Sequence, residues 1–228
     1  MKDKFLQDTL KYRQNDPDIS KRAFQSIAVN LWIKNLYGKD KAGGIDEYDT
    51  EMLHSGWRYA NIYSFIYKAN TAAKYDDGNI KFEYYDSLPV VLITKVTKTY
   101  IRGINLNLCN FALRTLILNT FYNLDPEFFD HGALDMASRK NVPFSKNISD
   151  LLLTEEGENK IIQYFNRQFN LNHIEYIYRT YNISKIKKPR LIEIWQWKYI
   201  PFLKYEETIK QDVLQKIWDI TNISKINI

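Results

Sequence analysis

The sequence predicts a single α+β domain in which a small antiparallel β-sheet or partial barrel is flanked by helices, with helical segments toward both ends. Residues 57–109 are rich in aromatic and β-branched residues that alternate as they do in strands. The segments around them place apolar residues at helical spacing. No linker and no repeat divides the chain. We therefore expect an N-terminal arm over residues 1–17 and one domain over 18–228, with a β core at about 57–109 and a helical and mixed part at about 110–228.

The N-terminal arm is polar and ends in the turn signal Asn15-Asp16-Pro17. We expect this arm either to be free or to dock on a neighbour. An amphipathic helix follows from Ser20 and ends at Gly38, and residues 39–55 are expected to form a loop. The apolar positions of this helix are Phe24, Ile27, Ala28, Leu31, Trp32 and Leu36.

Residues 60–68 alternate as a strand whose two faces are expected to be at least half covered. Residues 76–79 read Asp-Asp-Gly-Asn, a tight turn that closes a hairpin with residues 80–85. Residues 90–99 and 102–108 predict a second hairpin that turns near Arg102-Gly103.

A buried helix is predicted over residues 111–122, where it would cover the sheet. Residues 146–171 contain another helix, with Thr154, Glu155 and Glu156 suited to its first turn. Its core face is formed by Ile161, Ile162, Phe165 and Phe169.

The C-terminal part is mixed. Residues 174–186 fit a helix or a strand, and Pro189 is expected to end this segment. A short helical turn is expected over residues 195–197, an extended segment over 200–203 and a final helix over 206–220.

The composition is that of a soluble globular protein. The chain has 228 residues, of which 45% are hydrophobic and 26% charged. No apolar run reaches the ~20 residues of a membrane span, and the N-terminus lacks the apolar stretch of a signal peptide. Cys109 is the only cysteine, so intrachain disulfides are excluded, and its apolar neighbours favour a buried structural thiol over a nucleophile.

No motif in the chain points to catalysis, a cofactor or a metal. His54, His131 and His173 stand far apart, and no phosphate-binding glycine loop or nucleophile elbow occurs. Asp86 is better explained as a side chain that caps its own turn than as a catalytic acid. A set of loop residues could hold a cation through oxygen ligands, but solvated acids explain it more simply: Asp125, Glu127, Asp130 and His131. We therefore expect a protein that is not an enzyme.

One segment is strongly basic. Residues 179–204 contain seven basic residues and the single acid Glu193. Tyrosine and tryptophan side chains accompany the charge, as in proteins that bind single-stranded nucleic acids, but a solvated basic loop would look the same. The basic surface candidates are Arg179, Lys185, Lys187, Lys188 and Arg190.

Several short motifs resemble a family of small virion structural proteins of tailed bacteriophages, including T4-like phages. They lie between Gly56 and Leu203 and have the form Tyr-x-Phe-x-Tyr-Lys, Tyr-Tyr-Asp-x-Leu-Pro-Val-Val and Gly-x-Asn-Leu, with a closing Trp-x-Tyr-Ile-Pro-Phe-Leu. The chain departs from the family's usual pattern in a longer spacer over residues 68–84, in Leu88 before the proline, and in Leu108-Cys109-Asn110.

The resemblance implies a component of the neck, tail or baseplate, assembled in the host cytoplasm and present in the virion. It also implies other virion proteins as partners and a homo-oligomeric ring. Some proteins of this kind are described as protecting DNA ends, so a head-completion protein that binds DNA is the alternative. The aromatic candidates for the core or a partner interface are Tyr63, Phe65, Tyr67, Tyr84, Tyr85, Trp195 and Trp197.

Overall fold

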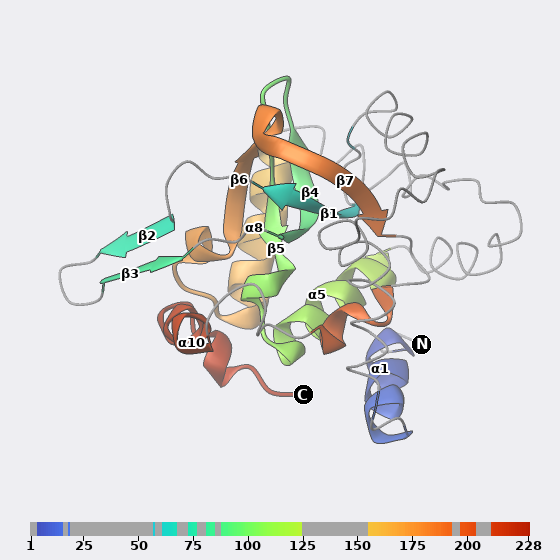
Figure 1. Ribbon diagram of the computed structural model, residues 1–228. Helices are drawn as coiled ribbons and strands as arrows, with labels where there is room; N and C mark the ends of the chain where they lie inside the picture. Colours follow the sequence, from blue (N-terminus) through green and yellow to red (C-terminus); the bar gives the residue numbers. More distant parts are fainter. Residues whose placement is uncertain are drawn as a thin grey trace, which may run out of the picture.

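The computed structural model confirms the α+β class and describes residues 4–15, 18, 57, 61–67, 73–76, 81–84, 88–124, 155–192, 197–203 and 211–228. Its centre is a five-stranded antiparallel sheet with helices packed around it (Figure 1). The predicted helix from Ser20, the loop over 39–55, and the side chains of Asp86 and Asp125 lie outside the described residues.

The sheet has the strand order β6-β5-β4-β1-β7. Its strands are β1 (Ile62–Tyr67), β4 (Val90–Val96), β5 (Tyr100–Asn105), β6 (Tyr178–Asn182) and β7 (Ile186–Ile192). The two edge strands, β6 and β7, are joined only by the short 3-10 turn η5 (Ile183–Lys185). Because such a short link cannot cross a flat sheet, the sheet coils strongly, and β7 runs from the end of β6 across the top of the sheet in Figure 1.

Ring contacts show how far the sheet is coiled. Phe65 on β1 and Tyr181 on β6 are separated by two strands in the sheet, yet their ring centroids lie 5.2 Å apart. Two strands of a flat sheet at this separation would lie roughly 14 Å apart. The sheet is therefore a partial barrel that does not close.

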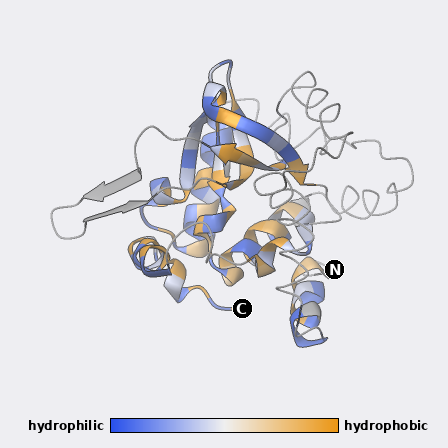
Figure 2. Cartoon of the chain, viewed as in Figure 1, coloured by the Kyte–Doolittle hydropathy of each residue, from blue (hydrophilic) through white to orange (hydrophobic). Residues whose placement is uncertain are grey.

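Both faces of the sheet are buried, as the sequence predicts for residues 60–68. The concave face holds an aromatic and aliphatic cluster of Tyr63, Phe65, Val91, Ile93, Ile101 and Tyr181. The convex face packs on the helices through Ile62, Val90, Leu92, Ile104 and Ile192. Figure 2 shows hydrophobic segments, in orange, along the sheet and the helices next to it.

The helix predicted to cover the sheet is α5 (Phe111–Leu124), the second predicted helix is α8 (Glu155–Phe169), and the C-terminal helix is α10 (Gln211–Ile220). Leu113, Phe121, Phe165 and Leu214 bring all three helices into the main core. Asn110 begins α5, because its side chain accepts a hydrogen bond from the backbone N–H of Leu113 at 2.8 Å. Cys109 is buried, as predicted.

The N-terminal arm is a helix that docks on its own chain, whereas the sequence led us to expect an arm that is free or docks on a neighbour. Helix α1 (Lys4–Asn15) packs on α5, with Phe5 buried in the main core. The backbone N–H of Leu6 donates to the side chain of Asn119 at 3.3 Å. The guanidinium of Arg13 lies 4.7 Å from the centre of the Phe111 ring. Phe5, Thr9 and Arg13 recur every four residues, a spacing that places them on one face of a helix.

Three local expectations were wrong. The second hairpin turns at residues 97–99, where the Thr97 hydroxyl accepts from the backbone N–H of Tyr100 at 3.0 Å, and not at Arg102-Gly103. Pro189 does not end the preceding segment but lies inside β7, where the register with β1 shifts. Residues 200–202 form a 3-10 helix and are not extended. The ambiguous stretch 174–186 contains strand β6 between two 3-10 turns.

A second, smaller sheet consists of β2 (Ala73–Asp76) and β3 (Lys81–Tyr84), the hairpin predicted around residues 76–79. Among the described strands, these two pair only with each other. In Figure 1 this two-stranded ribbon stands apart from the five-stranded sheet. We refer to it as the β2–β3 ribbon.

Candidate functional site

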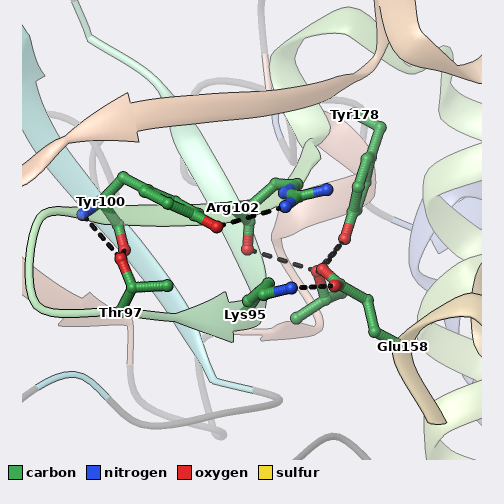
Figure 3. Close-up of polar contacts among 7 residues, drawn as sticks. Lys95, Thr97, Tyr100, Arg102, Glu158 and Tyr178 are labelled. Atoms are coloured by element: carbon green, nitrogen blue, oxygen red, sulfur yellow. Dashed lines mark hydrogen bonds and ion pairs between the residues drawn. The ribbon is translucent and has the colours of Figure 1, made fainter. Parts of the chain in front are cut away.

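A buried polar cluster joins α8 to the outer side of the β4–β5 hairpin (Figure 3). At its centre is Glu158, which is 2% exposed. Its Oε1 accepts hydrogen bonds from the hydroxyls of Tyr178 and, at 3.1 Å, Thr94. Its Oε2 lies 3.5 Å from the Nζ of Lys95. The carboxylate is therefore compensated on both oxygens, as burial of a charge requires.

A bulge in β4 makes this arrangement possible. The register with β5 shifts between Ile93 and Lys95, so Thr94 and Lys95 both reach Glu158 although they are adjacent in the strand. In a regular strand, adjacent residues point to opposite faces. The bulge thus places a hydroxyl and an ammonium group on the same carboxylate.

Arg102 extends the cluster toward the end of the hairpin. It pairs with Lys95 in the register, and its guanidinium lies 5.9 Å from the Tyr178 ring and 5.7 Å from the Tyr100 ring. Burial acts to lower the pKa of Arg102, but the hydrogen bond with Tyr100 and the charge of Glu158 leave it raised. Burial and the bond to Glu158 raise the pKa of Tyr178, so its phenol stays protonated.

The chemistry of this cluster is that of a structural link. Glu158 is held by three partners from two strands, and its side chain is only 3% exposed. A general acid or base must reach a substrate, and a carboxylate enclosed in this way does not. Among the described residues, no group of three or more His, Cys, Asp and Glu side chains could hold a metal ion.

Sequence reasoning missed Glu158, although a signal for it exists. Glu158 precedes Ile162 by four residues, Phe165 by seven and Phe169 by eleven, so it lies on the apolar stripe of α8. The acids just before it are typical of the exposed first turn of a helix, so Glu158 looks in the sequence like one more exposed acid. An acid on the core stripe predicts a buried partner, which here is Tyr178.

The sequence left open whether the aromatic candidates form a core or a contact surface. The structure places Tyr63, Phe65 and Trp197 in the core, each no more than 2% exposed. Tyr67 is half-buried and packs on Tyr181 with ring centroids 5.1 Å apart. Tyr84 ends β3, whereas Tyr85 and Trp195 lie outside the described residues. Of the aromatic candidates that the structure describes, only Tyr84 belongs to the β2–β3 ribbon.

The basic candidates are divided between both edges of the sheet. Arg179 lies on β6, Lys185 in η5, and Lys187, Lys188 and Arg190 on β7. By register, Arg179 shares a face with Tyr181, whereas Arg190 shares the opposite face with Ile192. The structure therefore does not gather all five into one patch.

Part of this charge does converge at one end of the partial barrel. The backbone N–H of Ile183 donates to the carbonyl of Thr99 at 2.9 Å, which holds η5 beside the β4–β5 turn. Lys98 in that turn, Lys187 and Lys188 are exposed, and Lys185 is half-buried. We call these four lysines the basic tip. Residues 97–102 and 178–192 contain seven basic residues and no acid, whereas the whole chain has a net charge of +5.

The β2–β3 ribbon has two unlike faces. Its register pairs Ala73 with Tyr84 and Tyr75 with Phe82, and these pairs alternate with Lys74–Glu83 and Asp76–Lys81. Paired residues of antiparallel strands share a face, and successive pairs occupy opposite faces. The register therefore assigns positions 73, 75, 82 and 84 to one side of the ribbon and positions 74, 76, 81 and 83 to the other.

Comparison with known proteins does not identify the class of this protein. No known family model, no curated protein and no solved structure matches this chain. No helix among the described residues is long and apolar enough to cross a membrane. What the fold defines is an open α+β partial barrel with an attached two-stranded ribbon.

Proposed function

We propose that this chain is a non-enzymatic structural subunit of a tailed-phage virion, repeated in a ring of the neck, tail or baseplate and in contact with other virion proteins. The observation that carries the proposal is the β2–β3 ribbon. It joins no other described strand, and its register assigns the aromatic positions 75, 82 and 84 to the same side. The resemblance of the strand and turn motifs to phage structural proteins supports the same function.

The ribbon fits an assembly role for an energetic reason. A two-stranded sheet by itself is at best marginally stable in water, and aromatic residues contribute most when they are covered. Pairing with a neighbouring subunit would stabilise the ribbon at assembly. Assembly interfaces are enriched in such aromatic residues and depleted of charge at their centre.

Mass spectrometry of purified particles of the phage that encodes the chain tests this proposal. The wild type should be present in several copies per particle. A variant with Tyr75→Ser, Phe82→Ser and Tyr84→Ser should fold but fail to join the particle, whereas Lys74→Ser with Glu83→Ser, on the other face, should join normally. Absence of the wild-type chain from purified particles would exclude the proposal.

The basic tip favours a second candidate, a protein that contacts DNA without sequence readout. Lysines without nearby acids in the same segments can neutralise phosphates, and the half-buried rings of Tyr67 and Tyr100 lie in the same part of the barrel. This candidate corresponds to the DNA-end-protecting alternative.

Fluorescence anisotropy with labelled single- and double-stranded DNA at about 50 and about 300 mM salt tests the second candidate. Replacing Lys185, Lys187 and Lys188 by Ala should weaken binding at least tenfold and reduce the salt slope by up to about 3, near one unit per lost phosphate contact. The control variant replaces the exposed Lys160, Lys216 and Lys225 by Ala, which removes the same charge outside the basic tip. Equal losses in both triple variants would contradict a DNA site at the basic tip.

A further inference from the structure

The two edges of the five-stranded sheet are built differently. Strand β7 has features that block the addition of another strand. Its register with β1 shifts between Ser64 and Ile66, Lys188 has a positive φ of 50°, and Pro189 has no backbone N–H. Lys187 and Lys188 are also exposed. Bulges, lysines and prolines are the usual protection of an edge strand.

Strand β6 has none of these features. It pairs with β5 over five successive residues without a register shift, and residues 178–182 contain no lysine and no proline. Thr180, at its centre, is exposed. The β6 edge is therefore a regular edge that can accept a partner strand.

The hydrogen bonds of β6 show which of its groups point away from the sheet. The N–H of Asn105 donates to the carbonyl of Ile177, so the residue pairs that exchange hydrogen bonds in this ladder are 103 with 179 and 101 with 181. The backbone groups of Tyr178, Thr180 and Asn182 consequently point outward. The N–H of Asn182 is directed at the Tyr67 hydroxyl, 3.4 Å away, in agreement with this assignment.

Tyr178 and Thr180 thus offer outward N–H and carbonyl groups in the register of a short strand. Each strand of the β2–β3 ribbon has four residues, a length that matches this edge. Within one molecule the ribbon and β6 belong to separate sheets. Among the residues that the structure describes, neither the ribbon nor the β6 edge has a further partner strand, and a second copy of the chain supplies one for each.

We propose that the β2–β3 ribbon of one copy adds to the β6 edge of a second copy by antiparallel or parallel strand pairing. This inference rests on the proposed repeated subunit. The contact is heterologous, because the ribbon of each copy meets a different surface of the next, and such contacts close into rings when the rotation permits.

Cross-linking of single-cysteine variants tests this contact. Cys109 is fully buried, so it does not compete with new surface cysteines for a thiol reagent. One variant carries Thr180→Cys on β6, and the others carry Lys74→Cys on β2 or Glu83→Cys on β3. A short bis-maleimide added to a mixture of the Thr180→Cys chain and either ribbon variant should give a heterodimer that contains one chain of each kind.

The matched acceptor control is Lys187→Cys on the protected β7 edge, which is also exposed. Its heterodimer yield with the ribbon variants should be at least tenfold lower. Equal yields with Thr180→Cys and Lys187→Cys, or no heterodimer with either, would overturn the proposal.

A backbone substitution gives an independent readout. Thr180→Pro removes the outward N–H but no hydrogen bond to β5, whereas Thr180→Ala keeps that N–H. In light scattering, Thr180→Ala should associate as the wild type does, and Thr180→Pro should lose association while its circular dichroism is unchanged. Equal association of both variants would argue against pairing at β6.

These outcomes separate the inference from the proposed function. If the chain is present in phage particles but gives no β6-specific heterodimer, the proposed structural role stands and the proposed contact is excluded. If the chain gives a β6-specific heterodimer but is absent from particles, the proposed contact stands and the virion role is excluded.

Discussion

Glu158 on α8 accepts a hydrogen bond from the hydroxyl of Tyr178 on β6, so a buried carboxyl group links the helix to an edge strand of the sheet. The Thr94 hydroxyl lies 2.5 Å from the Tyr178 hydroxyl and bonds to the same carboxylate oxygen. This network ties three elements together at one point. Hydrogen bonds to a buried charge are among the stronger ones in proteins.

Tyr178→Phe should therefore destabilise the protein by about 2 kcal/mol, because the Glu158 carboxylate loses a donor while it stays buried. Urea denaturation followed by tryptophan fluorescence measures this change. Tyr164→Phe on α8, the helix that carries Glu158, is the control. Tyr164 is 50% exposed, so this variant should change the unfolding free energy by less than about 0.5 kcal/mol. Similar values for both variants would show that the Tyr178 hydroxyl contributes nothing particular.

The docking of α1 predicts a local effect at the N-terminus. Phe5 is 8% exposed and packs on Tyr122 with ring centroids 6.4 Å apart. Phe5→Ala should cost about 3 kcal/mol of docking free energy and lower the hydrogen-exchange protection of residues 4–15 about 100-fold, while α5 keeps its protection. Gln14→Ala, at an exposed position of the same helix, should leave exchange unchanged. Parallel loss in α1 and α5 would mean that α1 does not open as a separate unit.

Much of the fold was predictable because its signals are local. The alternation around Phe65 predicts β1, and the apolar spacing around Leu113 predicts α5, since each pattern reports the element on which it lies. Arg114 shows where local signals stop. It is fully buried in α5 and donates to the backbone carbonyls of Leu106 and Leu203, and only the fold brings these carbonyls together.

The candidate site was harder to predict because it depends on the coiling of the sheet. The basic residues are contiguous in sequence, yet Arg179 and Arg190 lie on opposite faces and edges, because η5 links the first strand of the sheet to the last. Lys98 joins the basic tip from a distant part of the chain through the contact between Ile183 and Thr99. The buried position of Glu158 can be predicted from the sequence only if an acid is recognised on the apolar stripe of α8.

Gly103 is the position where this coiling leaves no room for a side chain. A Cβ atom built on Gly103 would lie 2.0 Å from the carbonyl oxygen of Leu92 and 2.9 Å from Cγ1 of Val91. Gly103→Ala should therefore lower the unfolding free energy by about 3 kcal/mol or more, since the backbone of β4 has to move. Urea denaturation checks this, with Thr180→Ala on the adjacent strand expected to change stability little. A neutral Gly103→Ala would mean that β4 and β5 lie further apart than this structure has them.

Cys109 predicts a loss of stability in alkali. Burial raises the pKa of its thiol from 9.0 to about 12, so the folded chain keeps a proton that the unfolded chain releases above pH 9. Its stabilising contribution is complete below pH 9 and decreases as the pH rises toward 12, with a limiting slope of about 1.4 kcal/mol per pH unit. Cys109→Ala lacks this contribution, so the difference in unfolding free energy between wild type and variant should fall by about 1.4 kcal/mol between pH 8 and pH 10. Urea denaturation of both proteins across this range measures the difference, and other titrating groups cancel because they are common to both. A difference that stays constant with pH would show that the thiol is accessible to solvent in the folded chain.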